Sequence, residues 1–133
     1  MMTTPIAFTA YSNKEADCDQ GAVVQFNSIV TNVGGFYDEN SSIFTVPTDG
    51  LYLFSASVRT AQSTQSMWSG ISHEGRILVD QYSSGNGNDQ GSSIALVECV
   101  AFDNVWVECR GDNREIAGER VSSFSGVLIL PYA

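Results

Sequence analysis

The stretch FTVPTDGLYLFSASV, residues 44–58, decides the fold class. Pro47, Asp49 and Gly50 carry the turn chemistry that ends one strand and starts the next. The segment LYLF, 51–54, then follows without a polar break. An antiparallel strand in a small soluble domain usually alternates apolar and polar side chains, with one face in the core and one in water. The stretch therefore predicts a strand with both faces covered.

The rest of the chain consists of short β-rich segments between turn residues, with almost no helical spacing. The polar stretch SNKEADCDQG, 12–21, is predicted to be a loop. About ten strands in one domain covering residues 1–133 predict two packed antiparallel sheets, a β-sandwich or jelly roll. The expected strands are 6–11, 22–26, 28–32, 42–46, 51–60, 66–73, 76–82, 92–102, 105–110 and 124–132.

Two more strands share the apolar character of LYLF. VLIL, 127–130, has apolar side chains on both sides, and in IALVECVAF, 94–102, Glu98 is the only polar break. A two-sheet sandwich buries only one face of each sheet. Because monomers rarely expose a broad apolar patch, we expect a symmetric oligomer to cover the second face.

Charge excludes several classes of partner. The chain carries fifteen acidic and six basic residues, for a net charge of −9. Nucleic acids and anionic membranes are bound by clustered positive charge, so neither is expected as a partner. No apolar run approaches the ~18 residues of a membrane span, so no membrane insertion is expected. The opening MMTTPIAF shows no signal-peptide pattern, which leaves a cytosolic location open.

The three cysteines show no CxxC spacing, so a metal or redox motif is not expected from them. Cys99 and Cys109 lie on consecutive expected strands and are predicted to be neighbours in space. They would form either a disulfide or two reduced core thiols, and reduced thiols are favoured. Cys18 lies in the polar loop and is expected to be exposed.

A set of aromatic and turn residues follows the intervals of the complement C1q globular-head signature. Its members here are Phe26, Asn32, Tyr37, Phe44, Gly50, Tyr52 and Phe54. FDNVWVE, 102–108, and FSGVLILP, 124–131, resemble two further motifs of that family. Ala56, Phe102 and Val127 depart from it, because the family has an aromatic, a glycine and an aromatic residue there. The chain thus resembles the C1q globular-head family over nearly its whole length.

The resemblance implies a ten-stranded antiparallel jelly roll, similar to tumour necrosis factor, that assembles as a homotrimer. It implies an extracellular location, because most members of the family are secreted. Stand-alone heads of this family bind microbial surface sugars, so the implied function is lectin-like pattern recognition in innate immunity. The acidic charge favours a neutral glycan such as mannan. The alternative is a trimeric ligand, like tumour necrosis factor, for a protein receptor.

The same resemblance implies a calcium site. Asp103 and Asn104 occupy the family's Gly-Asp turn, whose oxygens in several relatives help hold calcium near the trimer axis. Three-fold symmetry can multiply a sparse set of oxygen ligands into the six to eight that Ca²⁺ prefers. The alternative is plain turn chemistry, with Asp103 capping its own turn.

A sugar site is predicted around the loop SSGNGNDQG, 83–91. Tyr82 offers a ring for stacking, and Asn86, Asn88 and Asp89 offer planar polar groups in a long polar loop. Trp68 could join them, although core packing is favoured for it.

No enzyme is expected. His73 is the only histidine, and HEGR lacks the second histidine of a zinc-protease motif. No GxSxG nucleophile elbow is present. Arg110-Gly111-Asp112 spells an integrin-binding tripeptide, but a plain turn is favoured.

Overall fold

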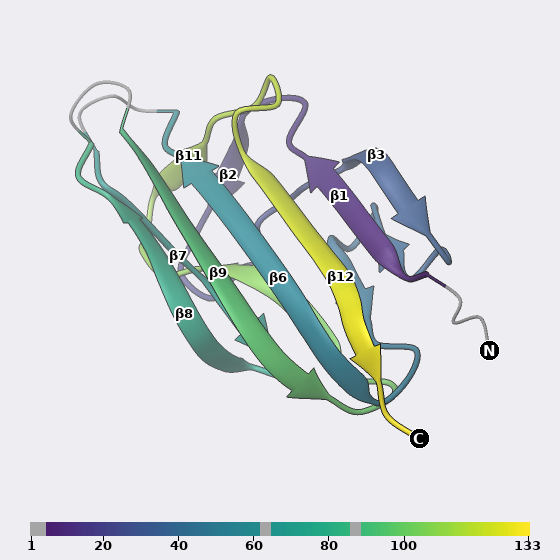
Figure 1. Cartoon of the computed structure of the whole chain (residues 1–133). Helices are drawn as coiled ribbons and strands as arrows, with labels where there is room; N and C mark the ends of the chain where they lie inside the picture. Colours follow the sequence, from purple (N-terminus) through teal and green to yellow (C-terminus); the bar gives the residue numbers. More distant parts are fainter. Residues whose placement is uncertain (1–4, 62–64, 86–88) are drawn as a thin grey trace.

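The computed structural model describes residues 5–61, 65–85 and 89–133, and this part of the chain contains only β-strands as regular elements (Figure 1). The strands are β1 (Ala7–Tyr11), β2 (Ala16–Cys18), β3 (Ser28–Val33), β4 (Tyr37–Asp38), β5 (Ile43–Thr45), β6 (Gly50–Arg59), β7 (Met67–His73), β8 (Arg76–Ser83), β9 (Gln90–Cys99), β10 (Asn104–Cys109), β11 (Arg114–Ile116) and β12 (Ser123–Pro131).

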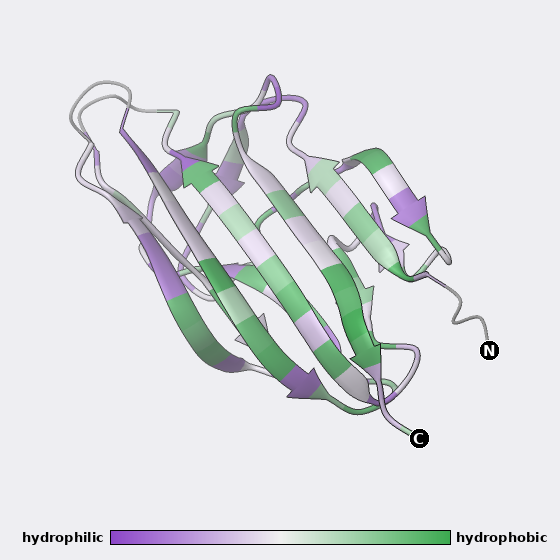
Figure 2. Ribbon diagram, viewed as in Figure 1, coloured by the Kyte–Doolittle hydropathy of each residue, from purple (hydrophilic) through white to green (hydrophobic). Residues whose placement is uncertain are grey.

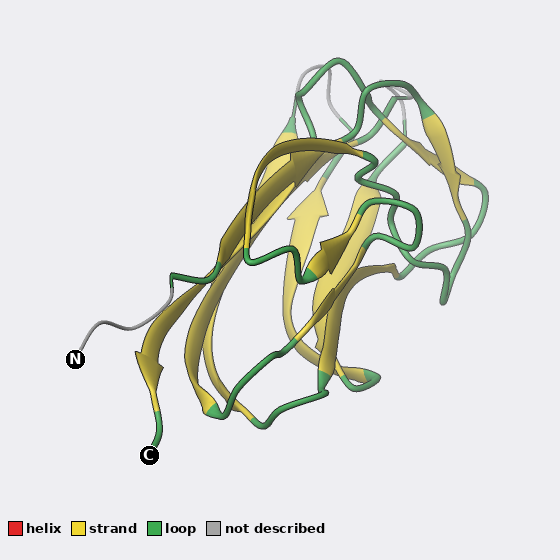
Figure 3. Ribbon diagram, turned by 90° about the vertical axis from the view of Figure 1, so that its right-hand side faces the viewer, coloured by secondary structure: helices red, strands yellow, loops and turns green. Residues whose placement is uncertain are grey.

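Ten of these strands form two five-stranded antiparallel sheets that pack face to face (Figure 3). The β6 sheet has the order β3-β1-β12-β6-β9, and the β7 sheet has the order β4-β5-β10-β7-β8. Strands β11 and β2 form a separate two-stranded pair. The predicted all-β jelly-roll sandwich is confirmed. Across the described ranges, no helix has the length and hydropathy to cross a bilayer.

Strand β6 explains the unbroken LYLF segment. Buried and half-exposed side chains alternate along its whole length. Tyr52 and Phe54 point into the sandwich and are fully buried, whereas Leu51 and Leu53 lie on the outer face of the sheet. Figure 2 shows hydrophobic residues along the lower parts of β12, β6 and β9. The strand is therefore apolar on both faces, as the sequence predicted.

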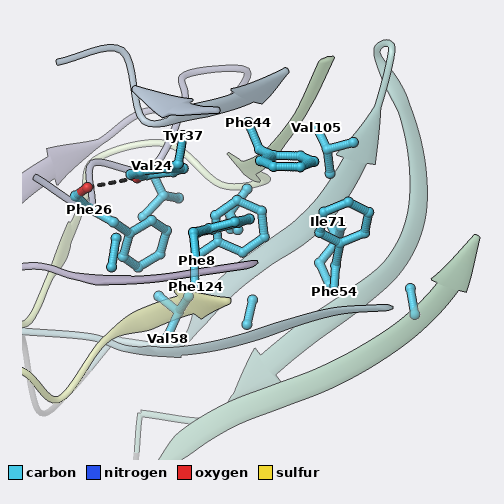
Figure 4. Close-up of a cluster of buried hydrophobic side chains, with 14 of the residues drawn as sticks. Phe8, Val24, Phe26, Tyr37, Phe44, Phe54, Val58, Ile71, Val105 and Phe124 are labelled. Carbon is cyan, nitrogen blue, oxygen red and sulfur yellow. Dashed lines mark hydrogen bonds between the residues drawn. The ribbon is translucent and has the colours of Figure 1, made fainter. Parts of the chain in front are cut away.

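Stacked aromatic rings fill the space between the sheets (Figure 4). The centre of the Phe8 ring lies 4.6 Å from the centre of the Tyr37 ring and 5.0 Å from that of Phe44, and both pairs are stacked. Phe8 and Phe124 form a T-shaped pair with ring centres 4.9 Å apart. The Tyr37 hydroxyl donates a hydrogen bond to the Phe26 carbonyl at 2.7 Å. Burial raises the pKa of Tyr37 to about 12, so the hydroxyl keeps its proton and its hydrogen bond. Most of the C1q-like aromatic positions therefore act as core residues.

Gly126 on β12 shows how closely this core is packed. A Cβ added there would lie 2.5 Å from the Phe8 ring and 2.7 Å from the Phe54 ring. Only glycine leaves room for both rings, so the packing of the core requires the glycine of the FSGV motif.

The strand predicted over 22–26 is not formed. Residues 21–24 instead run along the edge of β10 as irregular chain, with Gly21 N donating to Cys109 O and Val24 N to Val107 O. Only an isolated bridge joins Val23 to Glu108. Val24 and Phe26 are buried. The apolar spacing therefore predicted which side chains are buried, but it did not predict that the backbone here is irregular.

Three short strands, β2, β4 and β11, are absent from the sequence prediction. Each has two or three residues, too few for a period-two pattern to appear. Strand β2 lies within 12–21, which was predicted to be a loop, and it pairs with β11 by matching Cys18 with Arg114.

The cysteine prediction is wrong for Cys18 and Cys109 but confirmed for Cys99, which is a reduced core thiol. Cys18 is buried and forms a disulfide with Cys109, with Cα atoms 5.6 Å apart, and Cys99 is the buried free cysteine. Strands β9 and β10 follow each other in sequence but belong to different sheets, and Cys99 lies at the turn between them. Cys109 lies at the far end of β10, so closeness in sequence did not bring the two thiols together.

We predict that the unfolded, unreduced chain has one reactive thiol, from Cys99, and that reduction exposes all three. Replacing Cys18 and Cys109 together by serine should lower the free energy of unfolding by about 2–5 kcal/mol, because the disulfide closes a long loop. Thiol titration, peptide mapping and urea unfolding measure both effects. Cys99→Ala keeps the disulfide and is the control. A disulfide peptide containing Cys99 would contradict the assignment.

Candidate functional site

The outer face of the β6 sheet carries an apolar surface. Val127 pairs with Ala7 and with Leu53, and Leu53 pairs with Leu96, so one apolar row crosses four strands. Leu96 is 63% exposed in the single subunit. We call this surface the apolar outer face, and its members are Ala7, Leu51, Leu53, Leu96, Val127 and Leu130. A monomer would leave these side chains in water.

Polar side chains on the same face are hydrogen-bonded within the sheet. The Thr9 and Ser125 hydroxyls lie 2.8 Å apart, as do those of Ser57 and Ser92. A shallow depression of about 230 Å³ lies beside them, between β1, β12 and β6. Because these hydroxyls already have partners, the face suits a flat apolar contact better than a polar ligand.

The outer face of the β7 sheet is different, because it presents exposed aromatic rings. Trp68 on β7 pairs with Tyr82 on β8, and the two side chains are 41% and 60% exposed. The guanidinium carbon of Arg110 lies 4.9 Å from the centre of the Trp68 ring. The expectation that Trp68 packs in the core is wrong, because its neighbours Met67 and Ser69 take the inward positions.

Two carboxylates lie on the next row of this face. Glu108, Gly70 and Asp80 are paired in register across β10, β7 and β8. Gly70 makes room for Asp80, since a Cβ there would lie 2.6 Å from Asp80 Oδ1. Arg110 Nε lies 3.4 Å from the same oxygen. The guanidinium is thus held between a ring face and a carboxylate.

We call this group the aromatic platform, and its members are Trp68, Asp80, Tyr82, Glu108 and Arg110. It combines two exposed rings with hydrogen-bond acceptors and a donor group on rigid strands. Sequence reasoning identified Tyr82 as a site residue and weighed Trp68 as a further one, with core packing favoured for it. Asp80, Glu108 and Arg110 are brought to it by strand register, which no local motif encodes.

The tripeptide Arg110-Gly111-Asp112 is engaged at both ends by its own chain. Arg110 lies over the Trp68 ring, and Asp112 Oδ1 accepts a hydrogen bond from Gln20 N at 3.1 Å. Neither charged side chain is presented alone, which favours the structural interpretation of this segment over integrin binding.

The predicted sugar loop is placed only in part. Tyr82 belongs to the aromatic platform, whereas Asn86 and Asn88 lie outside the described residues. Asp89 Oδ2 accepts hydrogen bonds from the Ser84 amide, at 3.0 Å, and from the Ser84 hydroxyl. Hydrogen bonds from Ser84 lower the pKa of Asp89. Asp89 is therefore hydrogen-bonded to Ser84, and its role in binding a sugar stays a prediction.

The predicted calcium residues already have partners within the subunit. Asp103 Oδ2 accepts hydrogen bonds from His73 Nε2 at 2.7 Å and from Val100 N at 3.0 Å. Asn104 Oδ1 accepts one from the Thr45 hydroxyl at 2.9 Å. Partial burial opposes ionisation of Asp103, but the hydrogen bonds from His73 and Val100 prevail and lower its pKa.

This donor set does not fit Ca²⁺ within one subunit. Calcium takes six to eight oxygen ligands, whereas the metal-ligating groups that cluster with Asp103 are the His73 imidazole nitrogen and the Cys99 sulfur. Phe102 stands where the C1q motif has glycine and has a positive φ of 77°. A calcium site shared at a three-fold axis stays a prediction.

Comparisons with a family model and with individual known sequences agree on one family. The sequence model of the C1q domain matches residues 7–129. The mouse "Complement C1q tumor necrosis factor-related protein 3" is 28% identical over 84% of this chain and 46% of its own length. The mouse "Collagen alpha-1(X) chain" is 35% identical over 84% of this chain and 17% of its own length. The chain thus spans less than half the length of either relative.

Solved structures show the same fold at lower sequence identity. The globular domain of zebrafish complement 1qA protein covers 96% of this chain and 99% of its own, with a TM-score of 0.74 and 18% identity. Eiger TNF from S. frugiperda covers 98% of this chain and 96% of its own, with a TM-score of 0.82 and 14% identity.

We predict that Asp103→Asn lowers the free energy of unfolding by about 1 kcal/mol at pH 7, because it loses charge-assisted hydrogen bonds. The pKa of Asp103 is lowered by folding, so its contribution is present above the unfolded value of about 3.9 and is lost as acid protonates the folded carboxylate. Urea unfolding from pH 7 to pH 3 should therefore show the two proteins converging in acid. Glu74→Gln, in the neighbouring hairpin turn, is the control. A difference independent of pH would contradict the assignment.

Proposed function

Because this chain belongs to the C1q domain family, we propose that it is a lectin-like recognition protein that binds microbial surface carbohydrate as a homotrimer. The observation that carries the proposal is the aromatic platform, an exposed Trp68–Tyr82 pair beside carboxylates and a guanidinium. The proposed activity is binding in innate immunity and not catalysis.

The trimer rests on the apolar outer face. C1q-like and TNF-like domains form trimers, and this chain has a flat apolar surface available for that contact. Burying roughly 1,000 Å² of apolar surface gains about 25 kcal/mol before costs, against about 4–15 kcal/mol of lost translational and rotational freedom. A closed three-fold assembly would cover the face in every subunit.

The aromatic platform supplies the two kinds of contact that a sugar needs. The apolar face of a pyranose ring can stack on Trp68 or Tyr82, whose rings are rigid and already exposed. Hydroxyl groups of the sugar can donate to the carboxylates of Asp80 and Glu108 and accept from Arg110. The strands fix the backbone of these residues, and the contacts among Trp68, Arg110 and Asp80 restrain their side chains, so part of the ordering cost is met before the sugar binds.

Three platforms on one assembly would turn weak single contacts into strong binding to a repetitive surface. Once one head is bound, the others search at high effective concentration. The net charge of −9 disfavours anionic polymers, so a neutral polysaccharide such as mannan is the favoured ligand.

The disulfide supports an extracellular location. Cys18 and Cys109 are joined in the folded chain, and such bonds form and persist mainly in oxidising compartments. Microbial surfaces would be met in the same compartment.

A trimeric ligand for a protein receptor is the second candidate. The fold likeness to Eiger TNF, with a TM-score of 0.82, and to murine APRIL, with a TM-score of 0.76, motivates it. A receptor would be expected to contact grooves between subunits. Capture of one dominant membrane protein, unaffected by competing glycans or by Trp68→Ala, would favour this candidate over the first.

We predict that a glycan array detects neutral saccharides, and that Trp68→Ala weakens binding to mannan. Loss of one stacked ring costs about 1–2 kcal/mol, or about 5–30-fold for each head. Surface plasmon resonance on immobilised mannan measures the change, with and without a chelator. Phe102→Ala removes an aromatic side chain that is 83% exposed but lies outside the platform, so it is the matched control. No saccharide bound under either condition would sink the proposal.

We predict that Leu96→Lys converts the trimer into monomers, because a charge would be placed in the centre of the buried contact. Light scattering after size exclusion at micromolar concentration measures the mass. Tyr82→Lys changes an exposed residue on the other sheet and should remain trimeric. A wild-type chain that is monomeric and well folded would rule out the assembly.

A further inference from the structure

Three metal-ligating side chains meet at one end of the sandwich, outside the aromatic platform. His73 is the last residue of β7, Cys99 is the last residue of β9, and Asp103 lies in the turn just before β10. One ligand atom from each, an imidazole nitrogen, the thiol sulfur and a carboxylate oxygen, all lie within 4.8 Å of one another. The two sheets and the turn between them thus contribute one ligand each.

The kinds of atom in the cluster select the class of cation. Calcium and magnesium prefer oxygen ligands only. Zinc accepts nitrogen, sulfur and oxygen together, with bonds of about 2.0–2.3 Å in a tetrahedral arrangement. Cys99 is the cysteine outside the disulfide, so its sulfur is available for coordination. The Cys99 sulfur lies 4.0 Å from the Val97 carbonyl oxygen, so the hydrogen bond between them is weak.

The spacing of the cluster is close to that of a zinc site. Ligand atoms around tetrahedral zinc lie about 3.3–3.7 Å apart, as follows from the bond lengths. His73 Nε2 and Asp103 Oδ2 are now 2.7 Å apart, in a hydrogen bond, and no pair in the cluster exceeds 4.8 Å. Shifts of about 1 Å in side chains at a strand end and in a turn would reach the zinc geometry.

The turn that carries Asp103 is held in place by other contacts. Val100 N donates to Asp103 Oδ2, Ala101 N donates to Asp49 Oδ1, and Phe102 N donates to Val46 O. Such outer contacts orient a ligand before the ion arrives. The His73 and Asp103 side chains are 20% and 15% exposed, which gives an ion a path to the buried sulfur.

We propose that His73, Cys99 and Asp103 form a zinc site with a fourth position open to water. The ion would join the end of β7 to the β9–β10 turn and so tie the two sheets together at this end. The proposal does not rest on carbohydrate binding or on the trimer, because all three ligands come from one subunit.

Cobalt(II) is the probe, because a thiolate bound to Co²⁺ gives a near-ultraviolet charge-transfer absorption that other ligands do not. The folded protein is stripped with EDTA and titrated with Co²⁺. We expect this absorption to saturate at one ion per chain and to disappear when Zn²⁺ is added. Zinc at about 100 times its Kd should raise the Tm by roughly 10 °C relative to the stripped protein.

Variants assign the ligands. Cys99→Ala should abolish the cobalt absorption, and His73→Gln and Asp103→Asn should each weaken zinc binding at least about 100-fold. His73 is partly exposed, so His73→Gln tests the site even if Cys99→Ala folds poorly. Glu74→Gln and Trp68→Ala are controls that should bind zinc as the wild type does.

Several results would overturn the site. Absence of the cobalt absorption in folded wild-type protein is one, and its persistence in Cys99→Ala is another. Zinc affinity unchanged in both His73→Gln and Asp103→Asn would also exclude it. If calcium, but not zinc, raised the Tm in a way that depends on Asp103, the oxygen-only alternative would replace the proposal.

Discussion

Strand β6 must bury apolar side chains on both of its faces, and the other features of the molecule follow from this constraint. Its inward face places Tyr52 and Phe54 among the stacked rings that hold the two sheets together. Its outward face places Leu53 between Leu96 of β9 and Val127 of β12 in an apolar row, and it places Leu51 beside Leu130 of β12. A single subunit buries the first set of side chains and leaves the second partly exposed, and the proposed trimer would cover that outer face.

The outer faces of the β6 sheet and the β7 sheet differ in chemistry and are therefore suited to different contacts. The β6 sheet carries an exposed apolar row, and hydroxyl groups on the same face are hydrogen-bonded to one another, as in Thr9 and Ser125. The β7 sheet instead exposes aromatic rings together with charged groups that lie in contact, such as Arg110 over Trp68. If the first surface is buried between subunits, the second remains on the outside of the assembly. Assembly and ligand binding would then use separate surfaces and would not compete for the same residues.

Long strands and the fold class could be predicted from the sequence, because β-rich segments separated by turn residues, with almost no helical spacing, are a strong signal. The cysteine pairing could not, since it depends on which sheet receives each strand: β9 and β10 are consecutive but belong to different sheets, so Cys109 meets Cys18 and not Cys99. Trp68 was expected in the core because large aromatic residues usually lie there. Its exposure follows from β7 placing Met67 and Ser69 inward, which fixes Trp68 outward by strict alternation.

The β9–β10 turn shows how departures from a family pattern can be interpreted physically. Phe102 has a positive φ of 77° where the motif has glycine, so the side chain adds backbone strain, and its ring is exposed. The aspartate that follows keeps the motif's residue and accepts a hydrogen bond from His73 of β7. Cys99, one strand end away, adds a sulfur that an oxygen-binding cation would not use. The turn therefore lies beside nitrogen, sulfur and oxygen donors together, and the chemistry of these donors, rather than the motif alone, is the basis for inferring which ion it could hold.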